Sequence, residues 1–144
     1  MTKSDEALAL FREGFSCSQA VLAAFAGDNG LSREAALRIA QPFGGGIAGS
    51  GDWCGALTGA LLAIGHRYGR FRADDMAAKD KTYALVREFL ARFRALHAAV
   101  RCNDLLGCDI GTPEGRKAID EKNLHQTVCE TLVRDAVRIL EDIL

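Results

Sequence analysis

The chain has 144 residues, of which 49% are hydrophobic and 26% are charged, and its formal net charge is −1. A chain of this length and hydrophobic content can bury a core of its own, which excludes intrinsic disorder. The near balance of 18 basic and 19 acidic residues argues against a dedicated nucleic-acid binder or a protein that binds anionic membranes. We therefore expect a single domain over residues 1–144, with neither nucleic acid nor membrane as a partner.

The first third of the chain predicts three short helices. The first begins at residue 4 or 5 and ends near residue 13, before Gly14. The second begins at Cys17 behind Ser16, because Ser16 and Gln19 have the spacing of a capping box. The third opens at Ser32 and stops at Pro42, since proline disfavours a helical residue before it.

A glycine-rich run over residues 43–51 leads into a helix of about residues 53–66, for which Asp52 is the expected cap. This helix is apolar on every side, which is typical of a buried, central helix. Small residues four apart, Gly55 with Gly59 and Ala56 with Ala60, would let another backbone approach closely.

A long helix is expected from residue 74 to about residue 100. Its apolar positions alternate in steps of three and four, which predicts a packing seam. A single turn follows at residues 102–106, another helix begins at Pro113, and a last helix runs from a Thr127 cap through Ile143. The fold class is therefore all-α: a single-domain helical bundle around the central helix of about residues 53–66. The seam comprises Tyr83, Val86, Leu90, Phe93, His97 and Val100.

The five cysteines are the unusual feature of the sequence, and most of them lie at predicted helix starts. A helix N-terminus stabilises a thiolate by roughly 0.3–2 kcal/mol, which lowers a thiol pKa by about one unit. Full ionisation therefore needs a basic side chain or a metal as well. A set of cysteines that converges in the fold should be a metal site, a dithiol/disulfide couple, or a group of protonated thiols.

Two further observations bear on the cysteines. No pair has the C-x-x-C spacing of thioredoxin-like motifs or of a local zinc knuckle. The chain shows no basic start followed by a long apolar run, so we expect a cytoplasmic protein, in a compartment where thiols stay reduced. The odd number of cysteines also argues against a fully paired disulfide framework.

The chain resembles the redox-active protein family named for its cysteine pattern, C_GCAxxG_C_C. The resemblance rests on residues 15–21, on the glycine-rich run into residues 54–60, on residues 102–107 and on the cysteine of the last helix. The family name spells Gly-Cys-Ala where this chain has Cys54-Gly55-Ala56. Carried over by position, the four family cysteines are Cys17, Cys54, Cys102 and Cys129, and Cys108 is an extra one. The resemblance implies a redox role.

We predict Cys54 as the most reactive sulfur, since it follows the glycine-rich run and starts the buried helix. Cys17, Cys102 and Cys129 would be its partners, as resolving thiols or as co-ligands of a metal. His97 is the first choice for a further metal ligand or a base that activates a thiol; His66 and His125 are the other candidates. The glycines predicted to cradle a cofactor or other anion at the helix start are Gly44, Gly45, Gly46 and Gly51.

Three functions remain open from the sequence. The first is a thiol-dependent oxidoreductase or electron carrier that acts on a small-molecule or protein redox partner. The second is a metal-binding protein, with an iron–sulfur cluster or zinc held by the same four cysteines, with His97 as a further candidate ligand. The third is a helical interaction module without redox activity, dimerising as a homodimer through the seam of the long helix.

Overall fold

The computed structural model describes all 144 residues and contains helices, turns and one isolated β-bridge, with no strand. The all-α prediction is confirmed. The helices are α1 (Lys3–Glu13), α2 (Cys17–Ala26), α3 (Arg33–Ala40), α4 (Gly55–Tyr68), α5 (Met76–His97), α6 (Cys102–Leu106), α7 (Pro113–Glu121) and α8 (Glu130–Ile143). Short 3₁₀ turns cover Gly27–Asn29 and Gln41–Phe43, and a π-helical turn covers His125–Cys129.

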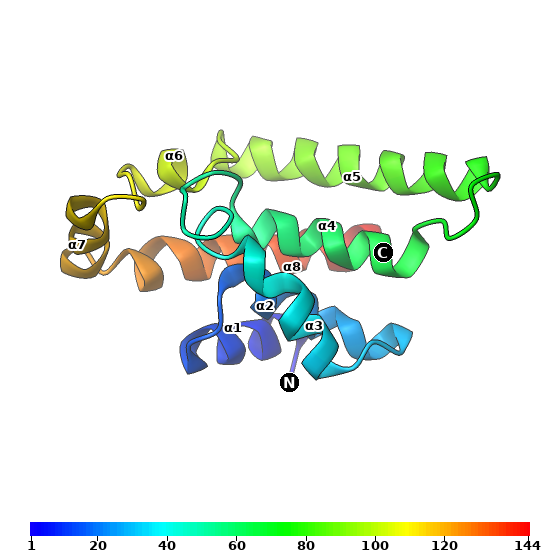
Figure 1. Cartoon of the computed structure of the whole chain (residues 1–144), viewed down its shortest axis with the longest axis horizontal. Helices are drawn as coiled ribbons and strands as arrows, with labels where there is room; N and C mark the ends of the chain where they lie inside the picture. The colour runs from blue at the N-terminus through cyan, green and yellow to red at the C-terminus, as the bar shows by residue number, and fades with distance from the viewer.

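Helices α4, α5 and α8 run along the long axis of the molecule, and α1, α2 and α3 lie across one side of them (Figure 1). Helix α4 packs against α2, α5 and α8, so it occupies the centre of the bundle as the sequence predicted. Its residues Leu57 and Ile64 are fully buried. Helices α6 and α7 and the glycine-rich loop gather at one end of the bundle (Figure 1). No helix is both long and apolar enough to cross a membrane.

The contact between α2 and α4 depends on the small residues of α4. A Cβ atom at Gly59 would lie 2.7 Å from the carbonyl oxygen of Ser18, and one at Gly55 would lie 3.1 Å from the Ser18 nitrogen. Ser18 is fully buried, and its hydroxyl donates a 2.7 Å hydrogen bond to the carbonyl of Ala40 at the end of α3. The predicted close approach of another backbone to α4 is confirmed, and that backbone belongs to α2.

The long helix α5 packs through a face that differs from the predicted seam. Phe93 is fully buried as expected, but Tyr83 is 52% exposed. Phe89, which the seam omitted, is fully buried and stacks against Phe93. The seam was wrong at Tyr83. Helix α4 reaches this turn, since the Thr82 hydroxyl donates to the carbonyl of Tyr68, but the Tyr83 ring lies on the exposed face beside Lys79 and Arg87.

Two predicted helix caps also differ from the structure. Asp52 does not cap α4; Cys54 itself is the N-cap residue of that helix. Thr127 caps nothing, because it lies within the π-helical turn that continues into α8, and its hydroxyl donates to the carbonyl of Asn123. The capping box of Ser16 and Gln19 at the start of α2 is confirmed.

Candidate functional site

Four helix starts or turns, remote in the sequence, bring four cysteines to one cavity of about 550 Å³. Cys17 comes from the first residue of α2, Cys54 from the cap of α4, Cys102 from the first residue of α6 and Cys129 from the turn before α8. All five cysteines of the chain are free thiols, and Cys108 does not line the cavity.

Backbone pairing holds Cys54 and Cys102 beside each other. Trp53 and Arg101 form an isolated antiparallel bridge. The amide of Cys54 donates to the carbonyl of Val100 at 2.8 Å, and the amide of Cys102 donates to the carbonyl of Asp52 at 2.6 Å. Residues next to a bridged pair point to the opposite face from it, so the two cysteine side chains share one face.

The glycine-rich loop forms one wall of the cavity through a left-handed turn. Residues 45 to 49 all have positive φ angles, from 51° to 75°. The amide of Ile47 donates to the carbonyl of Phe43, and that of Asp52 donates to the carbonyl of Gly46 at 2.8 Å. A Cβ atom at Gly46 would lie 2.7 Å from the Cβ of Cys102, so glycine is required for the loop to reach the cysteine.

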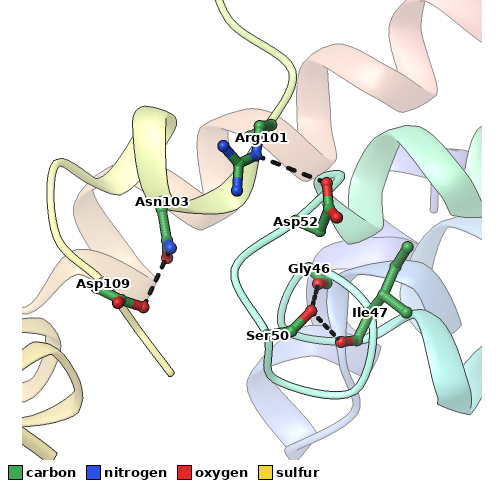
Figure 2. A network of polar contacts seen from close by, with 7 residues as sticks. All are labelled: Gly46, Ile47, Ser50, Asp52, Arg101, Asn103 and Asp109. Atoms are coloured by element: carbon green, nitrogen blue, oxygen red, sulfur yellow. Dashed lines mark hydrogen bonds and ion pairs between the residues drawn. The ribbon is translucent and has the colours of Figure 1, made fainter. Parts of the chain in front are cut away.

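Side chains fasten this loop to the α6 segment (Figure 2). Within the loop, the Ser50 hydroxyl lies 2.7 Å from the carbonyl oxygens of both Gly46 and Ile47. Between the two segments, Arg101 pairs with Asp52 at 3.6 Å. The loop thus holds a fixed shape beside Cys102.

The four glycines predicted to form a cradle divide into two groups. Gly44, Gly45 and Gly46 line the cavity. Gly51 does not; it is buried against the side chain of Asn103, whose atoms leave no space for a Cβ. Close packing against Asn103 is therefore a reason for glycine at position 51.

Cys129 is the one thiol of the cavity whose pKa falls. The neighbouring Cys17 thiol and His125 ring stabilise the Cys129 thiolate, and together they outweigh burial and lower the pKa of Cys129 to about 6. The same contacts raise the pKa of Cys17 and of His125, because each holds its proton against the Cys129 thiolate. Near neutral pH Cys129 is therefore a thiolate, beside the Cys17 thiol and the His125 ring.

Cys54 and Cys102 differ from Cys129 because burial dominates their ionisation. Burial raises the pKa of Cys54 to about 11, although the amides of Ala56 and Leu57 at the start of α4 act in the opposite direction. Burial and the neighbouring Cys54 raise the pKa of Cys102 to about 12. The predicted effect of the helix start on Cys54 is present, but desolvation of the charged form exceeds it.

Comparison with protein families identifies the family of the chain. The model of the family described as "Putative redox-active protein (C_GCAxxG_C_C)" matches residues 15–143. The chain belongs to this family. The four cysteines that we matched to the C_GCAxxG_C_C pattern from the sequence all line the cavity. No curated protein and no solved structure matches the chain.

His97, the histidine that we ranked first, lies outside the C_GCAxxG_C_C cavity. Its ring pairs with Asp135 of α8 at 2.9 Å and packs against Phe93. His66 is also remote, with its ring 3.2 Å from the carbonyl oxygen of Asn29. The histidine at the cavity is His125. A four-residue separation on a helix places two side chains on one face, so the spacing of His125 and Cys129 is the signal that would have found this pair.

The structure offers no set of ligands for the metal-binding alternative. No three side chains of the His, Cys, Asp or Glu type lie close enough together to hold a metal ion. The four cysteines share a cavity without forming such a group, so we derive no chemistry through a metal.

Proposed function

We propose that this protein is a thiol–disulfide oxidoreductase in which Cys129 is the nucleophile and Cys17 the resolving thiol. The observation that carries the proposal is the placement of Cys17, Cys129 and His125 on one cavity, where the two neighbours lower the pKa of the Cys129 thiol. A thiolate is the reactive form of cysteine, and a second thiol in contact with it can complete a disulfide. The expectation from the sequence that Cys54 reacts first is replaced here, because burial raises the pKa of Cys54 to about 11 and it keeps its proton.

The reaction with a disulfide substrate R–S–S–R has two steps. In the first, the Cys129 thiolate attacks one substrate sulfur, the S–S bond breaks, and R–S⁻ leaves and takes up a proton. In the second, Cys17 loses its proton to solvent and attacks the Cys129 sulfur, which releases the second R–S⁻. Two protein thiols are thereby oxidised to one disulfide, and one substrate disulfide is reduced to two R–SH.

The environment of Cys17 and Cys129 suits both steps. His125 and Cys17 stabilise the Cys129 thiolate before attack. Once Cys129 enters a mixed disulfide, its negative charge is gone, so the main cause of the raised pKa of Cys17 is removed as well. Cys17 therefore becomes a better nucleophile at the stage where it must attack. Cys54 and Cys102 remain protonated on the cavity wall near neutral pH.

The test is oxidation of the reduced protein followed by peptide mapping under non-reducing conditions. We expect a Cys17–Cys129 disulfide in the wild type and in the control variant Cys108→Ser, whose sulfur lies outside the cavity lining. In Cys17→Ser, the substrate thiol should remain attached to Cys129 as a mixed disulfide. Attachment of the substrate to Cys54 or Cys102 in Cys129→Ser, at the wild-type rate, would refute the assignment of the nucleophile.

A further inference from the structure

The wall of the cysteine cavity carries no permanently charged side chain. Of the 22 residues that line it, 12 are hydrophobic and none is Lys, Arg, Asp or Glu. Its ionisable groups are the four cysteines and His125, and the Cys129 thiolate already has the His125 ring as its neighbour. A charged ligand would thus lose its hydration without gaining an opposite charge on the wall.

Two ion pairs lie beside the cavity. Arg12, which follows the lining residue Phe11, lies 2.7 Å from Glu130, the residue after Cys129. Arg101 and Asp52, which precede Cys102 and Trp53, form the other pair. Each pair is neutral as a whole, and the carboxylates of Asp104, Asp109 and Asp120, which adjoin lining residues, are not part of the cavity wall.

The size of the cavity and the depth of the nucleophile restrict the substrate further. A volume of about 550 Å³ lies within the range of small-molecule sites, roughly 300–1,000 Å³. Cys129 is only 5% exposed. A disulfide on the surface of a folded protein cannot come into line with a sulfur at this depth, whereas a small molecule inside the cavity can.

We propose that the substrate of this site is a small, uncharged disulfide, in preference to an ionic disulfide or a protein. This inference rests on the proposed function, since it uses the Cys129 and Cys17 chemistry. The inference adds that the site selects its substrate by charge, because an ionic substrate would lose its hydration at the apolar wall of the cavity. The uncharged substrate loses little hydration on entry.

The test compares three small disulfides of similar size that differ in charge: bis(2-hydroxyethyl) disulfide, which is neutral, cystamine, a dication, and dithiodiglycolate, a dianion. The second-order rate constant for oxidation of the reduced protein is divided, for each compound, by its rate constant with free 2-mercaptoethanol. We expect the normalised value for the neutral compound to exceed both others at least tenfold. A smaller preference overturns the inference, even if every compound forms the Cys17–Cys129 disulfide. If none of them forms that disulfide, the proposed function fails as well.

A charge placed on the cavity rim tests whether substrates enter through this cavity. Gln41 lines the cavity and is exposed. The ratio of the dithiodiglycolate rate to the cystamine rate should rise at least threefold in Gln41→Lys and fall at least threefold in Gln41→Glu. An unchanged ratio in both variants would overturn the inference. Oxidised protein disulfide isomerase tests the protein alternative: the inference also fails if it oxidises Cys17 and Cys129 faster than bis(2-hydroxyethyl) disulfide does.

Discussion

The ionisation of Cys129 provides the most direct check of the site. With a pKa of about 6, this thiol should be about nine-tenths ionised at pH 7, whereas an unperturbed thiol with a pKa near 8.5 is about 3% ionised. The gain in rate is smaller than this contrast suggests. A thiolate whose pKa is lower by about 2.5 units is intrinsically about tenfold less nucleophilic, so the net gain at pH 7 is roughly two- to threefold. The midpoint of the pH profile is therefore the decisive quantity.

The measurement is the rate of iodoacetamide labelling at Cys129, followed by peptide mass spectrometry between about pH 4 and pH 9 in a Cys108→Ser background. We expect a sigmoid with its midpoint near the pKa of about 6, and little labelling of Cys54 or Cys102 over the same range, because their pKa values are about 11 and about 12.

Two variants separate the donors to the Cys129 sulfur. Cys17→Ala should raise the midpoint further than His125→Asn, because the Cys17 hydrogen bond is the largest contribution to the lowered pKa of Cys129. In both variants the labelling profile moves toward that of an ordinary thiol. A wild-type midpoint near pH 8.5, or no shift in Cys17→Ala, would refute the proposal that these contacts stabilise the thiolate.

Three further predictions concern stability, and thermal or urea unfolding measures each. Gly59→Ala should destabilise the fold by about 1–3 kcal/mol, because its Cβ would meet the Ser18 backbone at 2.7 Å. The control Gly65→Ala on the same helix meets nothing within 4 Å and should be neutral or stabilising by up to about 1 kcal/mol. Equal effects of the two alanines would contradict the close approach of α2 and α4. Ser18→Ala should cost about 1–3 kcal/mol, since it leaves the buried carbonyl of Ala40 without its donor, and an unchanged stability would show that this hydrogen bond contributes nothing. Ile47→Gly should stabilise the fold slightly. Ile47 has a left-handed backbone with φ of 67°, and glycine would relieve about 1–2 kcal/mol of strain there, which exceeds the entropy cost of glycine of about 0.5–1 kcal/mol. A lower melting temperature of the variant would count against that strain.

The local features of the fold could be read from the sequence because they depend on neighbouring residues. The Ser16 capping box, the stop at Pro42 and the apolar helix after the glycine-rich run are contacts or restrictions within a few residues. The placement of cysteines at helix starts is of the same kind. Cap assignments failed at Asp52 and Thr127, where the backbone path around the cavity determines where the helix begins.

The chemistry of the site depends on the tertiary structure. The sequence offers four cysteines, but only folding shows that Cys17 contacts Cys129 while Cys54 is desolvated in the same cavity. A thiol pKa is the balance between burial and a few close neighbours. Burial arises from tertiary packing, and the largest contribution to the pKa of Cys129 comes from Cys17, more than a hundred residues away in the sequence. Tertiary packing also explains why His97 pairs with Asp135, whereas His125 lines the cavity. Sequence periodicity places a residue on a helix face, and packing alone decides which neighbour that face meets.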